Sequence, residues 1–119
     1  MVLICEDDPA LREFLRVALD RDFRFAETAD GLEAVERARE LRPEVVLLDV
    51  MLPGQSGLDA LRQIRADPEL SNTRVIVMTA FSDVGPSEVA AAGADSFLSK
   101  PFDPLELIQA VGELLARDR

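Results

Sequence analysis

Short apolar runs recur along the chain, and longer stretches of mixed polarity separate them. The runs are Val2–Cys5, Phe23–Ala26, Val45–Leu48 and Val75–Met78, with a weaker run at Ser96–Leu98. Brief runs of aliphatic and β-branched residues are typical of strands that are buried on both faces of a parallel sheet. The pattern therefore predicts a strand at each run.

Helical patterns fill the intervals between these runs. Asp8 and Asp103 each precede a proline, which suits an N-cap followed by proline at the first helical position. Glu106 stands at the capping-box position after Asp103, and Asp30 can cap another helix. Apolar residues then recur at helical spacing: Leu11, Phe14, Leu15, Ala18 and Leu19; Leu32, Val35 and Leu41; Leu58, Leu61 and Ile64; Leu107, Ile108, Val111, Leu114 and Leu115, in a last helix expected from Asp103 to Arg117.

The interval after Thr79-Ala80 is less regular, because Gly85-Pro86 interrupts it. Glycine costs roughly 1 kcal/mol and proline roughly 3 kcal/mol inside a helix. We therefore expect only a short helix there, from about Ser87 to Ala92, with Pro86 at its first position.

Strands and helices thus alternate along the chain, with no linker, repeat or low-complexity stretch. This order predicts a single α/β domain over residues 1–119, a flavodoxin-like, doubly wound, five-stranded parallel sheet of order 2-1-3-4-5 with helices on both faces. In such sheets the ligand site lies beyond the carboxyl ends of the strands, at the point where the strand order reverses.

Composition narrows the chemistry that is open to the chain. There is no histidine, which excludes imidazole catalysis and the usual zinc sites, and the single Cys5 lies in an apolar run that favours a buried, inert thiol. The net charge of −10 argues against direct binding to nucleic acid and suits cations or basic partners. No apolar run approaches a membrane span and no signal peptide is evident, so we expect a cytoplasmic protein.

Polar residues stand just past the carboxyl ends of several predicted strands. Glu6, Asp7 and Asp8 follow the first strand and Asp49 the third, while Thr79 and Lys100 follow the fourth and fifth. Two carboxylates about 4 Å apart repel each other by about 4 kcal/mol at an effective dielectric constant of 20. A divalent cation and a lysine can relieve that repulsion, and an oxygen-lined site open to water suits magnesium. A carboxylate beside such a cation can serve as a nucleophile that accepts a phosphoryl group.

Each of these residues also has a plain structural interpretation. Asp8 is best explained as a helix cap rather than a metal ligand, Asp49 could be a turn residue ahead of Pro53-Gly54, and Lys100 a solvated lysine. The placement of the whole set at one end of one sheet favours a common site.

The same residues lie in motifs that resemble those of the receiver domains of two-component response regulators, the CheY-like superfamily. The resemblance covers nearly the whole chain. It rests on Leu3-Ile4-Cys5-Glu6-Asp7-Asp8, on Val46-Leu47-Leu48-Asp49-Val50-Met51-Leu52-Pro53-Gly54 with Gly57-Leu58, on Val75-Ile76-Val77-Met78-Thr79-Ala80, on Ala92-Gly93-Ala94-Asp95 and on Lys100-Pro101-Phe102.

The resemblance implies a role for each matching residue. Asp49 would accept a phosphoryl group from a histidine kinase or phosphotransfer protein. Mg²⁺ would be held by Glu6, Asp7, Asp49 and the backbone carbonyl of Met51. Catalysis would further involve Lys100 and Thr79, while Thr79, Ala80 and Phe97 would form a switch that changes a surface read by a downstream protein or output domain. The Lys100–Pro101 bond would be cis.

Departures from the family pattern suggest differences in behaviour. Phe97 stands where tyrosine is frequent, and apolar Met51 and Phe81 stand where residues can guide hydrolytic water, which predicts slow self-dephosphorylation. Ala110, Gly112 and Ser96 replace charged residues of the class that dimerises through the last helix, so we expect no salt-bridged dimer. Phe81–Pro86 is expected to be a mobile loop that responds to Thr79.

Two other functions remain open from the sequence. The first is a phosphate-independent interaction module on the same fold, although such a module has no reason to keep all five site residues. The second is a magnesium-dependent hydrolase of the haloacid dehalogenase type, in which the acid after the first strand is followed by another two residues on. The stretch Glu6-Asp7-Asp8-Pro9 does not match that spacing.

Overall fold

The computed structural model describes residues 1–19, 23–80 and 84–116. Its strands are β1 (Val2–Cys5), β2 (Phe25–Thr28), β3 (Val45–Asp49), β4 (Arg74–Thr79) and β5 (Ser96–Ser99). They form one parallel sheet in the order β2-β1-β3-β4-β5, which confirms the predicted strand order.

The second strand begins two residues later than the apolar run that suggested it. Phe25 pairs with Val2 and Thr28 with Cys5, whereas the Phe23 amide donates to the Leu19 carbonyl at the end of the first helix. The strand lies at an edge of the sheet and is mostly half-buried, so its polar residues belong to it as much as its apolar ones.

The helices are α1 (Pro9–Leu19), α2 (Gly31–Leu41), α3 (Gly57–Ala66), α4 (Pro86–Ala91) and α5 (Pro104–Ala116), with a 3₁₀ turn at Pro68–Leu70. Asp30 accepts hydrogen bonds from the amides of Leu32 and Glu33, as its N-cap role requires. The predicted capping box forms at the N-terminus of α5, since the Glu106 amide donates to Asp103 Oδ1 and the Asp103 amide donates to Glu106 Oε1. The short α4 with Pro86 at its start also matches the prediction. The predicted end of the last helix, Arg117, lies outside the described residues.

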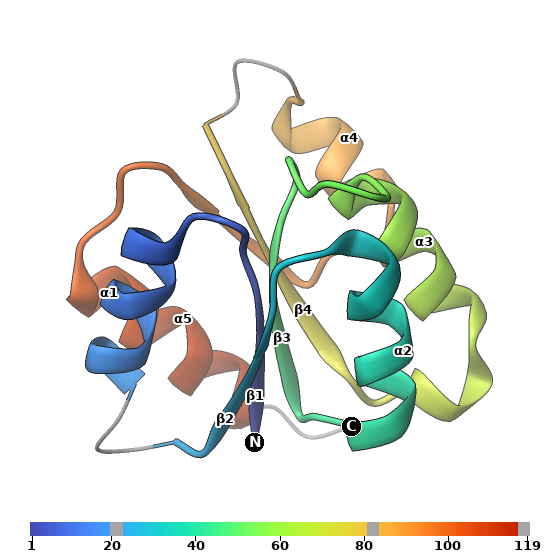
Figure 1. Ribbon diagram of the computed structural model, residues 1–119, viewed down its shortest axis with the longest axis horizontal. Coiled ribbons are helices and arrows are strands. Elements are labelled where there is room, and N and C mark those ends of the chain that lie inside the picture. The colour runs from blue at the N-terminus through green and yellow to red at the C-terminus, as the bar shows by residue number, and fades with distance from the viewer. Residues whose placement is uncertain (20–22, 81–83, 117–119) are drawn as a thin grey trace.

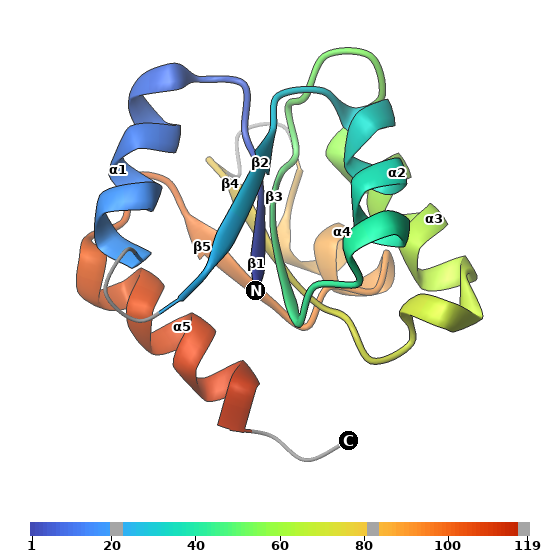
Figure 2. The same ribbon diagram turned by 60° about the horizontal axis from the view of Figure 1, so that its bottom comes forward.

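Helices cover both faces of the sheet. Figure 1 shows α1 and α5 on one face and α2, α3 and α4 on the other, and the turned view of Figure 2 agrees. The buried central strands alternate between two cores: Leu3 and Leu48 pack under α2 and α3, while Ile4 and Leu47 pack under α1 and α5. This explains why these strands read as continuous apolar runs. Within the described ranges, we find no helix that combines the length and the apolar character needed to cross a membrane.

Candidate functional site

The carboxyl ends of β1 and β3 bring two acids together. Cys5 pairs with Leu48 in the sheet, so the residues that follow them, Glu6 and Asp49, leave neighbouring strands at the same level. β2 lies on one side of β1 and β3 lies on the other, so the strand order reverses between β1 and β3, where these two acids stand. Both acids are buried, with 1% of Glu6 and 4% of Asp49 exposed. Two buried carboxylates at neighbouring strand ends repel each other, and a nearby cation compensates for that repulsion.

Lys100 supplies part of that compensation. It follows β5, and its backbone amide donates to the Thr79 carbonyl at 2.8 Å. Its Nζ donates to Glu6 Oε1 at 3.1 Å and to Asp49 Oδ2 at 3.0 Å, so one ammonium bridges both acids. The Lys100–Pro101 bond is cis, as expected.

The buried charges perturb one another. Burial, opposed by the Asp8 amide and reinforced by the nearby Asp49 carboxylate, raises the pKa of Glu6 to about 7. Burial alone would lower the pKa of Lys100, but its hydrogen bond and attraction to Asp49, together with Glu6, raise that pKa overall. Lys100 is therefore held charged, and one ammonium is shared between two acids.

Asp7 completes a cluster of acids that can hold a metal ion. Oxygen atoms of Glu6, Asp7 and Asp49 all lie within 4.8 Å of one another, and Asp7 is exposed where the other two are buried. A set of carboxylate oxygens with an opening to water fits a hard divalent cation such as Mg²⁺. The sequence prediction that these acids converge is therefore confirmed by geometry.

The loop after β3 is tied to the same acid. The Met51 amide donates to Asp49 Oδ1 at 3.1 Å, while Lys100 donates to the other oxygen, Oδ2. The two hydrogen bonds together orient the Asp49 carboxylate. The Met51 side chain is 62% exposed. The role predicted for the Met51 carbonyl as a metal ligand stays a prediction.

The remaining predicted residues lie around this centre. Thr79 is buried at the end of β4, one residue beyond the pair formed by Asp49 and Met78. Ala80 follows it and is exposed, and Phe97 on β5 is 45% exposed. Phe81 lies outside the described residues, as does half of the Phe81–Pro86 loop, so the predictions made for them are not addressed by the structure.

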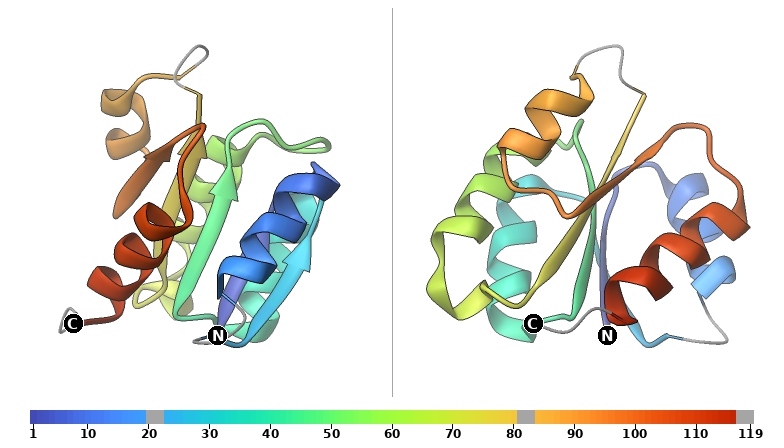
Figure 3. Two further views of the ribbon diagram at one scale, coloured as in Figure 1. Left: turned by 90° about the vertical axis from the view of Figure 1, so that its left-hand side faces the viewer. Right: turned by 180° about the vertical axis from the view of Figure 1, so that it is seen from behind.

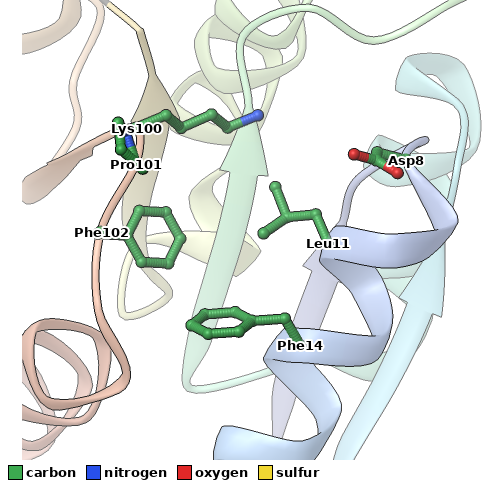
Figure 4. Close-up of a pocket in the computed structure, with 6 residues that line it drawn as sticks. All are labelled: Asp8, Leu11, Phe14, Lys100, Pro101 and Phe102. Carbon is green, nitrogen blue, oxygen red and sulfur yellow. The ribbon is translucent and has the colours of Figure 1, made fainter.

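An apolar hollow of about 350 Å³ opens beside Lys100 (Figure 4). It lies between α1 and the segment that follows β5. The rings of Phe14 and Phe102, which line it, meet edge to face with their centroids 6.0 Å apart. Lys100 extends over this hollow toward the side on which Asp8 lies. The stem of the lysine thus runs along apolar surface while its ammonium reaches the acids.

Sequence reasoning placed Asp8 correctly and missed Arg12. Asp8 Oδ1 accepts a hydrogen bond from the Ala10 amide, which confirms the helix cap, and the Asp8 amide donates to Glu6 Oε2 at 3.0 Å. Arg12 donates from Nη1 to the backbone carbonyl of Glu6 at 2.9 Å. In a sequence, an arginine within a helix is usually interpreted as part of a solvated face. Only the position of Arg12 in the first turn of α1, shortly after the end of β1, could have indicated this contact.

Known proteins are similar in sequence over nearly the whole chain. The chain is 40% identical to the DNA-binding response regulator MtrA of Mycolicibacterium smegmatis and 42% identical to the transcriptional regulatory protein CseB of Streptomyces coelicolor. Each alignment covers 98% of this chain but 51% and 49% of the relative, so the chain spans about half the length of these curated relatives.

Solved structures give the same picture. The receiver domain of a Pseudomonas aeruginosa sensor histidine kinase, which has a magnesium ion coordinated in its active site cleft, superposes with a TM-score of 0.89 at 30% identity, covering 98% of this chain and 97% of that one. The chemotaxis response regulator CheY4 of Vibrio cholerae gives 0.87 at 28% identity, covering 95% and 96%. The family model of the response regulator receiver domain matches residues 2–112. With its site and fold in agreement with that match, the chain belongs to the family of response regulator receiver domains.

Proposed function

We propose that this receiver domain, as one unit over residues 1–119, accepts a phosphoryl group on Asp49 in a magnesium-dependent reaction. The observation that carries the proposal is the shared ammonium: Lys100 bonds Glu6 and Asp49 together, beside a third carboxylate that completes a cation site. The donor is a phosphohistidine of a partner kinase or phosphotransfer protein, or a small acyl phosphate.

The carboxylate of Asp49 acts as the nucleophile. One of its oxygens forms a bond to phosphorus as the bond between phosphorus and the donor's imidazole nitrogen breaks, and the electron pair stays on that nitrogen. Glu6, Asp7, Asp49 and the Met51 carbonyl are the residues that would hold Mg²⁺, which when bound neutralises charge on the phosphoryl oxygens. Lys100 contributes a second positive charge to those oxygens, and the Met51 amide keeps the Asp49 carboxylate oriented.

Phosphorylation then biases a two-state surface. The hydroxyl of Thr79 moves to a phosphoryl oxygen, exposed Phe97 turns inward behind it, and the small side chain of Ala80 leaves room for both changes. Neither the exposed Met51 side chain nor Phe81 can position a water molecule, so the domain dephosphorylates itself slowly. It is a switch and not a conventional enzyme.

The longer relatives suggest what the switch controls. Two of them are named for DNA binding or transcriptional regulation and are about twice as long as this chain. We infer that the phosphorylated domain acts on an output segment or a separate protein in the cytoplasm. The domain itself makes no direct contact with nucleic acid, because its net charge is −10.

Mass spectrometry after incubation with magnesium and acetyl phosphate tests the proposal. The wild type should gain one phosphoryl group, Asp49→Asn should gain none, and Lys100→Ala should be loaded more slowly or fail to signal. Omitting magnesium is the control for the metal. Equal loading of Asp49→Asn would refute the site, and no loading of the wild type would favour a phosphate-independent interaction module.

A further inference from the structure

The backbone of Glu6 is held from two sides. Its amide donates to the carbonyl of Thr28 on β2 at 3.0 Å, and its carbonyl accepts from Arg12 Nη1 at 2.9 Å. The amide belongs to the peptide between Cys5 and Glu6, and the carbonyl belongs to the peptide between Glu6 and Asp7. The two hydrogen bonds therefore hold the peptides on both sides of Glu6, beyond the last residue of β1. The directions in which the Glu6 and Asp7 side chains leave the chain depend on these two peptides.

Arg12 is itself oriented by Glu27 on β2, because the Arg12 Nε lies 3.5 Å from Glu27 Oε1. Arg16 forms a separate pair with the other oxygen of Glu27, at 3.1 Å from Nη1 to Oε2. Arg16 is held in turn by Glu13 at 2.8 Å. Figure 3 shows α1 running alongside β2, the arrangement that lets the two elements share these charges. About a quarter of the Arg12 and Glu27 side chains is exposed, so this pair is partly shielded from water.

We propose that Arg12 is a positioning residue for the metal-binding acids, acting through the Glu6 carbonyl, with Glu27 as its orienting partner. The inference rests on the proposed magnesium-dependent function of the site. Arg12 contacts neither the ion nor the phosphoryl group in this scheme. It fixes the peptide from which Glu6 and Asp7 project, so that their carboxylates stand ready to bind the cation.

Electrostatics and positioning predict opposite signs, which makes the inference testable. Arg12 is a positive charge that contacts the backbone of one of the three acids, so its removal should strengthen cation binding if only the local field matters. If Arg12 holds the acids in place, its removal should weaken binding, and loss of such an outer contact typically costs roughly 10- to 100-fold in metal affinity.

The experiment measures Mg²⁺ dissociation constants by isothermal titration calorimetry for the wild type, Arg12→Met and Arg16→Met. Arg16→Met is the matched control, because it removes the same charge from the same helix and the same Glu27 but makes no bond to the Glu6 carbonyl. We expect the dissociation constant to rise about tenfold in Arg12→Met and to stay constant or fall in Arg16→Met. Arg12→Lys, which keeps the charge on a flexible stem, should fall between wild type and Arg12→Met.

Two further measurements separate this role from general stability. Loading by acetyl phosphate should need more magnesium in Arg12→Met but should approach the wild-type rate when magnesium is saturating. Hydrogen exchange of metal-free protein should be faster at residues 6–8 in Arg12→Met and unchanged in the cores. An unchanged or lower dissociation constant in Arg12→Met would overturn the inference and leave the proposed function intact, whereas a wild type that binds no magnesium would refute both.

Discussion

At the scale of single residues, the site contains more negative charge than its lysine can neutralise. Glu6 and Asp49 share the ammonium of Lys100, while Asp7 stands in the same cluster and is exposed to water. Metal-free protein therefore keeps a repulsion that a divalent cation removes. The residues that we propose as metal ligands are in this way unfavourable for folding without the ion.

Replacing Asp7 with asparagine should therefore change stability in opposite directions with and without metal. Without magnesium, we expect Asp7→Asn to raise the free energy of unfolding by about 0.5 kcal/mol, since one exposed like charge is lost. With magnesium at about 100 times the wild-type dissociation constant, the wild type should gain about 2.7 kcal/mol. The variant should gain much less, because a ligand is missing.

Urea denaturation with EDTA or with magnesium measures both effects. Glu113→Gln is the control, because it removes one exposed acid from α5, away from the cluster. A full magnesium response in Asp7→Asn would show that this carboxylate is not a ligand.

At the scale of elements, helix α3 meets the end of β3 backbone to backbone. The Gly57 amide donates to the Val50 carbonyl at 2.8 Å, and a Cβ placed on Gly57 would lie 2.1 Å from the Asp49 carbonyl oxygen. Backbone atoms cannot move aside as a flexible side chain can. The first residue of α3 therefore sets how closely the helix packs against the end of β3.

Gly57→Ala should push α3 away from Asp49. We expect a loss of about 2 kcal/mol in the free energy of unfolding, in the range of other overpacked sites, together with slower phosphoryl loading. Guanidinium denaturation and the loading rate measure the two effects.

Gly112→Ala is the matched control, because nothing lies within 4 Å of a Cβ at this exposed position on α5. It should stabilise the domain by about 0.5–1 kcal/mol, as removal of glycine from a helix interior does. Equal stability of Gly57→Ala and the wild type would contradict the proposed contact.

At the scale of the whole molecule, two cores on opposite faces of one sheet hold the domain together, and α5 belongs to one of them. Leu107, Val111 and Leu114 are buried on its inner face, and buried Arg74 on β4 donates to the Leu114 carbonyl. The outer face of α5 carries Gly112, and partly buried Ala110 packs toward the core. Neither residue has a charge with which to pair across an interface.

We therefore expect the phosphorylated domain to form no salt-bridged dimer through α5 and β5. Ser96 on β5 likewise has no charge to offer. Light scattering with beryllofluoride and magnesium, at low and high salt, should give a monomer mass under both conditions. A dimer that appears with beryllofluoride and dissolves in salt would contradict this prediction.

The sequence predicted most of the site because its residues are local extensions of buried strands. Each acid follows an apolar run, and parallel strands place their carboxyl ends at one edge of the sheet, so the sequence alone groups Glu6, Asp49, Thr79 and Lys100. Where burial is only partial, as in the edge strand β2, the apolar run marked the strand two residues too early.

By itself, then, the chain determined the order of elements, the caps of α2 and α5 and the end of the sheet where the acids and Lys100 gather, because these depend on local periodicity and on neighbours in sequence. Only the tertiary structure decided which groups touch. Lys100 lies 94 residues from Glu6 and 51 from Asp49, and α1 had to pack beside β2 before Arg12 could reach Glu27 and the Glu6 carbonyl. Those contacts follow from the packing of distant elements, on which no local pattern reports.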